Sequence, residues 1–439
     1  WVSLLEAPLL ALILGYFSRY VAGESGNPNQ YIFFENVNLP VFFLMSVIVA
    51  LFIGLVVSAE QIIQDRPILK REEFLNLSRS GYLNSKVLFL MLLSAIQMVT
   101  YLLIANLLLG IRGMTLPFWF LLFTTAFNAN LLGLNLSANL KSLIAIYVLI
   151  PLLLIPQLLL SGSAIKFDKL PPGMKAEEHV PLIGDVMISR WAYETFMVYQ
   201  FKNNNFEKHF YEIDREISQA SFLLNYLVPE TENHIIQIKQ HTEDTLLTQE
   251  IEFVVNQLYR VSEYLNQEIN GDKIRDELMH WTTDSTEAIL GKYKSAISKA
   301  RSSYIRERDR IVSTLQEKLT KDALVELKEN NVNQAVTDLV TARDEQKKYT
   351  IKSADMIQRS DPVFRAPLDK TGRAHFFAPE KRLGSWAVST YWFNIMVLWL
   401  FNLLLYFLLI SNQLSKINTF VTNSIYLIRR KIINFITPY

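Results

Sequence analysis

The chain has 439 residues, of which half are hydrophobic and only 19% are charged. This balance, with a positive mean hydropathy, is unusual for a soluble protein of this length and indicates a membrane protein. The formal net charge of +1 argues against a polyanion binder, so no nucleic acid is expected, and the absence of cysteine excludes disulfides, thiolate metal sites and a cysteine nucleophile.

A helix that crosses a bilayer core about 30 Å thick needs roughly 20 apolar residues. Six runs meet this test, in residues 4–22, 39–58, 87–110, 117–138, 140–162 and 390–410. The fifth contains Pro151 and Pro156, which a membrane helix tolerates where neighbouring groups satisfy the freed carbonyls. The sequence therefore predicts an all-α membrane protein with six spans. Because the chain opens at Trp1 and no cleavage site follows the first run, we expect a truncated chain and no signal peptide.

Lysine and arginine in the short connections predict the orientation. They are frequent in 59–86 and beyond the sixth span, whereas 23–38 has none and 110–116 has only Arg112. We therefore expect both termini and the 59–86 segment to be cytoplasmic. This orientation makes 163–389 extracytoplasmic.

The stretch 207–385 carries helical periodicity and is predicted to form a helical domain of its own. Apolar residues recur at steps of three and four in two sets, namely Leu247, Ile251, Val254, Leu258, Val261 and Leu265, and then Ile289, Tyr293, Ile297, Ala300 and Tyr304. Asn270-Gly271-Asp272 offers a break between the sets, which predicts a long antiparallel helical hairpin. Residues from Val325 to Lys348 are expected to add another helix.

Two segments beside the sixth span are predicted to lie at membrane surfaces. Residues 412–439 place apolar side chains among lysines and arginines, which indicates an amphipathic helix on the inner surface. A solvated helix that packs on a soluble partner domain is the alternative. Residues 372–382 mix aromatic and cationic side chains and are expected to lie along the outer interface, so membrane lipid is an expected partner.

The sequence offers no catalytic constellation, so whether the chain is part of an enzyme stays open. A phosphate-binding loop of the G-x-x-x-x-G-K-[ST] type is absent, because Gly291-Lys292 is followed by Tyr293 and lacks the upstream glycine. The six histidines never pair at metal-binding spacing. We expect no catalytic residue, cofactor or metal site on this segment.

The octapeptide from Asp65 to Glu72, DRPILKRE, packs five charges of both signs between the second and third apolar runs. A short amphipathic helix of this kind suits docking on a cytoplasmic partner and passing a push into the spans. The ordinary charge of cytoplasmic loops explains the same residues equally well. From charge content alone both interpretations stay open.

DRPILKRE resembles the Glu-Arg-Pro-(hydrophobic)2-x-(Lys/Arg)-Glu pattern that follows the second span in type-2 ABC exporters of the White, or G, subfamily. The similarity continues in Ser80-Gly81-Tyr82 and Ser85-Lys86, where the family often has a Gly-Tyr or Ala-Tyr step and a cation that opens the third span. In the family, the pattern forms a coupling helix that contacts the nucleotide-binding domain.

A second similarity follows the fifth span, in Phe167 to Pro172, Ser189 to Phe196 and Gln200-Phe201. The family places there a re-entrant segment, a Pro-Pro turn, and a Ser-Pro-x-x-Tyr-x-x-Glu-Ala-Leu helix that ends in Asn-Glu-Phe. Arg190 departs from this pattern because proline is usual at its position. The resemblance covers roughly 1–206 and 386–411.

The resemblance implies the type-2 ABC exporter fold, with an insert between the fifth and sixth spans that looks like the enlarged outer loop of bacterial envelope versions. It therefore implies the cytoplasmic (inner) membrane of a bacterium. The expected division is spans one to five in 1–162 with a coupling helix near 60–80, a re-entrant or outer loop in 163–206, the extracytoplasmic domain in 207–385, the sixth span in 386–411 and the tail in 412–439.

The resemblance also implies partners. The contacts to a nucleotide-binding domain would be Asp65, Arg66, Lys70, Arg71 and Glu72, with Glu72 as the key acid. That domain would hold ATP and Mg and would lie either upstream on the same chain or on a separate one. A second transmembrane subunit is implied, with a homodimer favoured over a heterodimer.

Polar residues inside the predicted spans are either cargo contacts or partners in hydrogen bonds between helices; they are Gln97, Asn106, Asn128, Asn130, Asn135 and Gln157. The resemblance places cargo at the dimer axis between the second and fifth spans, which makes pocket candidates of Phe42, Phe43, Met45, Phe52, Leu153 and Gln157. Aromatic lining suits amphipathic or lipid-like cargo. The same rings also suit simple packing or contact with lipid.

Two functions remain from these observations. The first is the membrane half of an ATP-driven ABC exporter that moves a hydrophobic or amphipathic cargo. The second is a mechanical or scaffolding protein whose outer domain works an envelope protein without transport. The large insert favours at least a docking role for the outer domain, because compact loops are normally far shorter.

Overall fold

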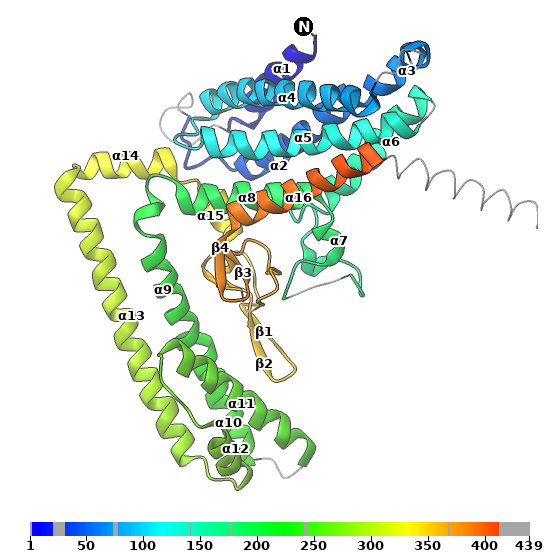
Figure 1. The fold of residues 1–439 in the computed structure, drawn as a ribbon. Coiled ribbons are helices and arrows are strands. Elements are labelled where there is room, and N and C mark those ends of the chain that lie inside the picture. Colours follow the sequence, from blue (N-terminus) through cyan, green and yellow to red (C-terminus); the bar gives the residue numbers. More distant parts are fainter. Residues whose placement is uncertain are drawn as a thin grey trace, which may run out of the picture. The chain divides into compact units, whose positions relative to one another are not determined.

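The computed structural model describes residues 2–20, 31–72, 78–140, 142–174, 178–240, 244–367 and 369–411, without the side chains of residues 72 and 244–246. The described chain is mostly helical and divides into two compact units (Figure 1). The first unit comprises Trp1–Met197 and Val388–Tyr439, and the second comprises Val198–Ala387. The predicted tail, 412–439, lies outside the described residues.

The first unit is built from apolar helices. Within the described ranges, four helical stretches are long and apolar enough to cross a membrane: Leu39–Arg71, Arg79–Leu109, Thr115–Asn139 and Thr390–Ser411. Two further apolar helices, at the places of the first and fifth predicted spans, have 17 residues each: α1 (Val2–Ser18) and α6 (Leu143–Leu159). These helices indicate a multi-pass membrane protein, and the count of six spans stays a prediction.

The longest stretch consists of α2 (Leu39–Ala59) and α3 (Gln61–Glu72), and the next three are α4 (Arg79–Leu109), α5 (Thr115–Asn139) and α16 (Thr390–Ser411). α5 packs against α2, α4 and α16 (Figure 1). Of its most apolar window, 72% is buried, compared with 33% in α4 and in α16, so α5 is the central helix of this unit.

Glycines allow α2 and α5 to approach closely. A Cβ atom on Gly54 of α2 would lie 2.5 Å from the carbonyl oxygen of Ala126, and one on Gly133 of α5 would lie 2.0 Å from Ser58 Oγ. Both distances are shorter than any normal contact. Without side chains here the two backbones pack directly, as small residues permit between membrane helices.

Five of the polar span residues hydrogen-bond to another helix of the unit. The bonds run from Asn128 to Asn402 Oδ1 (2.8 Å), Asn130 to Ser94 Oγ (2.6 Å), Asn135 to the Leu405 carbonyl (2.9 Å), Gln97 to the Ser3 carbonyl (2.7 Å) and Asn106 to Thr115 Oγ1 (3.0 Å). For these five amides the interpretation as links between helices is confirmed. Such bonds supply association energy where lipid offers no hydrophobic drive.

The segment after α6 continues with η2 (Phe167–Lys169), α7 (Leu182–Asp185) and α8 (Ile188–Asn203). The second unit then contains η3 (Glu207–His209), α9 (Tyr211–Phe222), a π-helical turn η4 (Leu223–Leu227), α10 (Val228–Gln240), α11 (Asp244–Tyr264), α12 (Gly271–Met279), α13 (Asp284–Lys318), α14 (Lys321–Asn331) and α15 (Gln334–Val340). The single helix expected over 325–348 is therefore replaced by α14 and α15.

Four short strands in the described part of the chain were not predicted. β1 (Tyr349–Lys352) pairs antiparallel with β2 (Asp355–Gln358), so that Thr350 faces Ile357 in the register. A one-turn helix, η5 (Pro362–Phe364), follows β2, and β3 (Glu380–Leu383) pairs with β4 (Trp386–Ser389), directly before α16. Strands of four residues are at the lower limit of about four to eight over which alternation predicts a half-buried strand.

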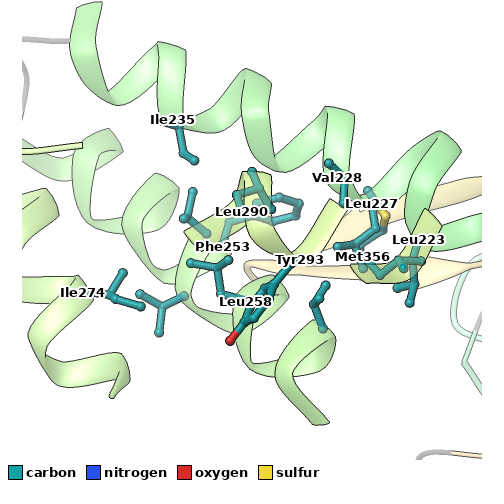
Figure 2. Packing of buried hydrophobic residues seen from close by; sticks show 14 of the residues in the cluster. Leu223, Leu227, Val228, Ile235, Phe253, Leu258, Ile274, Leu290, Tyr293 and Met356 are labelled. Atoms are coloured by element: carbon teal, nitrogen blue, oxygen red, sulfur yellow. The ribbon is translucent and has the colours of Figure 1, made fainter. Parts of the chain in front are cut away.

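The second unit has its own hydrophobic core, in which α10, α11, α12 and α13 meet (Figure 2). The predicted apolar stripe is confirmed, since Ile251, Val254, Leu258 and Val261 are buried there. Tyr293 of α13 belongs to the same core.

The predicted helical hairpin is wrong in its partners. α11 packs mainly against α10 and α13 packs mainly against α9, with α12 between α11 and α13 along the chain. Asn270 indeed marks a break, because its side chain caps α12 by accepting from the Lys273 N–H. Apolar period identifies the buried face of a helix but not the helix that covers it.

The segment 372–382, which was expected to lie at a membrane interface, contains both buried and exposed side chains. Lys381 is completely buried and His375 is 7% exposed. The imidazole Nε2 of His375 lies 2.8 Å from the carbonyl oxygen of Pro362. Arg373 is exposed and Arg382 is half-buried, so the position of this segment at a membrane interface stays a prediction.

Candidate functional site

The octapeptide DRPILKRE lies within α3, which follows α2 almost directly. Its first turn is held by α5, because Ser137 Oγ accepts hydrogen bonds from the backbone N–H groups of Ile62 (3.1 Å) and Ile63 (3.0 Å). Ile62 is buried. N–H groups at a helix start lack carbonyl partners in their own helix, so a hydroxyl from α5 is a stabilising cap for α3.

Arg66 ties the middle of α3 to the end of α5. One guanidinium nitrogen, Nη2, lies within hydrogen-bond distance of the carbonyl oxygens of Ser137 (2.8 Å), Ala138 (3.0 Å) and Leu140 (2.6 Å). These carbonyls close α5, where no further turn supplies amide donors and where the helix dipole is negative. Arg66 therefore caps α5 with a cation.

Asp65 ties α3 to α4. Its Oδ2 atom accepts from the Tyr82 hydroxyl (2.7 Å) and lies 2.8 Å from Lys86 Nζ. Lys86 also donates to Gln61 Oε1 at 3.1 Å. Tyr82 and Lys86 of α4, which match the family pattern, thus contact the octapeptide. α3 is therefore bonded both to α4 and to the end of α5.

The rest of the octapeptide faces outward. Ile68, Lys70 and Arg71 are exposed, the first with 52% of its surface accessible. Lys70 and Arg71 lie in the last turn of α3, where cations are favoured by the dipole. The side chain of Glu72 lies outside the described part of the chain. The predicted contact residues therefore divide into two that bond within the chain and two that remain exposed.

The cargo candidates Phe42 and Phe43 are buried within the unit. The Phe43 ring stacks on Phe196 with centroids 5.0 Å apart and meets Phe118 edge-on at 5.5 Å. Phe42 adjoins this cluster, 6.1 Å from Phe43. Aromatic pairs of this geometry stabilise a core, so these two rings are packing residues of the single chain.

The other cargo candidates are more accessible. Phe52 is 43% exposed, and Met45 and Leu153 are half-buried. Gln157 holds the start of α8, because its Oε1 accepts from the Ser189 N–H at 2.9 Å and its carbonyl accepts from the Ser189 hydroxyl. Its amide thus links α6 to α8, which fits the interpretation as a hydrogen-bonding partner between helices.

The sequence analysis noticed Arg190 only as a departure from the family pattern. In the structure its guanidinium is 1% exposed and lies 3.8 Å above the Trp191 ring. Nη1 is 3.6 Å from Oε2 of the fully buried Glu194, and Nη2 is 3.7 Å from Oδ1 of Asp185. Asn394 of α16 donates to the same Glu194 oxygen at 3.0 Å. The spacing of four residues between Arg190 and Glu194 is the signal that could have revealed the pair.

Metal-binding groups do not gather in the described ranges, where no three His, Asp or Glu side chains could hold an ion together. The described site residues are hydrogen-bonding and packing residues, and the arrangement around α3 is mechanical. It joins a short exposed helix to the ends of two apolar ones.

Residues 1–201 match the family model described as ABC-2 type transporter. The matched part runs from α1 into α8 and includes α3. This match indicates the membrane part of an ABC-type transporter, and such membrane domains typically pair with a nucleotide-binding partner. No curated protein matches the chain.

Proposed function

We propose that this chain is the membrane-spanning half of an ATP-driven ABC exporter, similar to the White/G subfamily, in the cytoplasmic membrane of a bacterium. It would work as a homodimer and export a hydrophobic or amphipathic cargo such as a lipid or lipid-linked molecule. The match of 1–201 supports the transporter class. α1 and α6 would complete six spans, since 17 residues is the lower limit of about 17–25 for a crossing helix.

The observation that carries this proposal is the bonding of α3. Arg66 holds the end of α5, and Asp65 holds Lys86 of α4. A nucleotide-binding domain with bound ATP and Mg would press on the exposed Ile68, Lys70 and Arg71, with Glu72 beside them. Because α3 is bonded to α4 and α5 and continues from α2, its displacement would be passed to three spans together.

The exposed faces of α2 and α6 support a dimer with cargo between the subunits. α6 buries only Ile146 and Ile150 within the unit, so most of its apolar surface is left for lipid or a second subunit. Phe52, Met45 and Leu153 would line the cargo path, backed by the Phe42 and Phe43 cluster.

The test is the double charge reversal K70E/R71E, compared with Arg310→Glu on α13 as a control of the same chemistry. The chain is purified with its ATPase partner from its own membrane and placed in proteoliposomes. We expect K70E/R71E to keep the dimer, seen by native mass spectrometry, and to lose cargo-stimulated ATP hydrolysis by at least about tenfold. Arg310→Glu should change neither. Unchanged stimulated hydrolysis in K70E/R71E, or a wild-type chain that binds no ATPase, would refute the exporter.

The mechanical alternative draws on the second unit, which is compact and has its own core. Such a unit could transmit nucleotide-driven movement to an envelope protein. Deletion of 207–385 separates the two functions. Transport retained in vesicles makes the second unit accessory to export, whereas retained ATP hydrolysis with normal cargo retention but a lost envelope phenotype favours the mechanical function.

A further inference from the structure

A cavity of about 430 Å³ opens within the second unit. One wall is formed by α9 and η4, and the other by α15, residues 341–348 and the pair Ser360-Asp361. This volume lies in the range of small-molecule sites, about 300–1,000 Å³, near the lower end. The proposed transport function makes no use of it.

Irregular backbone gathers at this cavity. η4 is a π-helix, a conformation that is rare and frequent at functional sites, and it carries the lining residues Asn225 and Tyr226. Ala342 and Asp361 have φ angles of 48° and 51°, in the left-handed region that residues other than glycine seldom adopt. Asp361 lines the cavity, and Ala342 lies between two lining residues. Strain of this kind marks ligand-binding sites more often than ordinary loops.

Two cations of the lining retain donors for a ligand. Arg343, whose side chain is 70% exposed, contacts Asp338 Oδ1 through Nη1 at 3.3 Å. Lys348 donates to the carbonyl oxygen of Arg343 at 3.1 Å. Neither side chain has another hydrogen-bond partner among the described residues, so most of the eight N–H groups of the two side chains are available. Such donors recognise carboxylate or phosphate oxygens through charge-assisted hydrogen bonds.

The remaining side chains that line the cavity carry hydroxyl groups, an amide and an aromatic ring. Hydroxyls come from Ser218, Ser221, Thr337, Thr341 and Ser360. Asn225 is exposed, and its amide bonds to no residue that the structure describes. The half-buried ring of Tyr226 adds a flat apolar surface. Asp361 accepts from Ser218 at 3.0 Å, and burial raises the pKa of its carboxyl.

We propose that this cavity is a binding site for an acidic sugar of one or two rings that carries a carboxylate or a phosphate group. Arg343 and Lys348 hold the anionic group, Asn225 bonds ring hydroxyls, and Tyr226 packs against a sugar face. The site is independent of export, because all its residues belong to the second unit and none belongs to the matched segment 1–201.

The test measures binding to the full chain in phosphatidylcholine nanodiscs by titration calorimetry, without ATP. Maltoside detergents are avoided because their headgroups are sugars and would compete. The probes are glucose 6-phosphate, glucuronate, neutral glucose and inorganic phosphate. The variants are R343Q and K348Q, with R310Q as the control, since Arg310 is 78% exposed and lies outside the cavity lining.

We expect glucose 6-phosphate and glucuronate to bind at least about tenfold more tightly than glucose or inorganic phosphate. R343Q and K348Q should each weaken both acidic sugars by about tenfold, and R310Q should change nothing. Equal binding of inorganic phosphate and glucose 6-phosphate would overturn the sugar assignment. Equal binding of neutral glucose would overturn the anionic one. No saturable binding up to about 10 mM, or binding that neither variant weakens, would overturn the site. Circular dichroism shows whether each variant is folded.

Discussion

The guanidinium of Arg66 and the carbonyl oxygen of Leu140 lie 2.6 Å apart, although 74 residues separate them in the chain. Leu140 is the C-cap residue that follows the end of α5, and Arg66 also lies within hydrogen-bond distance of two carbonyls of the last turn. A cation thus stands where a further helical turn would have supplied amide donors. Any displacement of α3 must carry the end of α5 with it or break this cap.

Arg66→Gln should loosen the end of α5. Glutamine carries no charge and is too short to contact the three carbonyl oxygens. We expect this loss to lower the free energy of unfolding by about 1–3 kcal/mol. Hydrogen exchange should become faster at the amides of Asn139 and Leu140. Arg71→Gln is the matched control, because Arg71 is exposed on the same helix. Equal exchange rates in the two variants would show that Arg66 does not stabilise the end of α5.

The ion pair between Asp65 and Lys86 should show coupling in a double-mutant cycle. The two side chains are 28% and 24% exposed, so solvent screens them only in part. We expect Asp65→Asn and Lys86→Gln to interact by about 1 kcal/mol in unfolding free energy measured in mixed micelles. Purely additive effects would mean that the contact contributes nothing to stability.

Glu194→Gln should strongly destabilise the first unit. It removes the charge 3.6 Å from the buried Arg190 guanidinium and leaves Asp185, 3.7 Å away and 23% exposed, as the acidic partner of that cation among the described residues. Breaking a buried pair costs about 3–5 kcal/mol, whereas replacing both partners costs far less. Arg190→Met in the Glu194→Gln background should therefore recover much of the loss in thermal unfolding. A double variant less stable than the single one would contradict this account.

Gly54→Ala should disturb the packing of α2 on α5. The new Cβ atom would meet the Ala126 carbonyl and the Ala129 side chain, and relief of such overpacking costs about 1–3 kcal/mol. Gly291→Ala on α13 is the control, since nothing lies within 4 Å of its Cβ position and a helical alanine gains about 0.5–1 kcal/mol. Opposite shifts in melting temperature are expected, and a stabilised Gly54→Ala would disprove the close approach.

Glu207 should make the stability of the second unit depend on pH. Burial raises the pKa of its carboxyl to about 7, and Asp214 adds to this while Arg308 and Lys328 oppose it. The folded chain then binds this proton more tightly than the unfolded chain, whose carboxyl titrates near 4.5. The free energy of unfolding should therefore fall as pH rises from about 4.5 to about 7, and then level off.

Glu207→Gln should remove that component, so the stability difference between variant and wild type should grow in favour of the variant over the same pH range. Glu212→Gln is the control, because its carboxyl is 75% exposed. Parallel pH profiles for wild type and Glu207→Gln, followed by fluorescence-detected melting, would show that Glu207 titrates normally.

Local properties of the sequence determined much of this molecule. Apolar length placed α2, α4, α5 and α16, because crossing a bilayer requires a fixed number of residues whatever their neighbours. Helical period found the buried face of α11, from Ile251 to Val261. The motif DRPILKRE pointed to α3 before any helix was seen there.

Only the tertiary structure decided which groups meet. Asp65 pairs with Lys86, and Arg66 bonds to the carbonyls at the end of α5. Lys70 and Arg71 are exposed. α13 packs mainly against α9, Arg190 is buried beside Glu194, and the cavity of the second unit lies between η4 and α15. These outcomes depend on contacts between residues far apart in the chain, which set the partner of each buried face and charge, whereas period and composition report only on the segment that carries them.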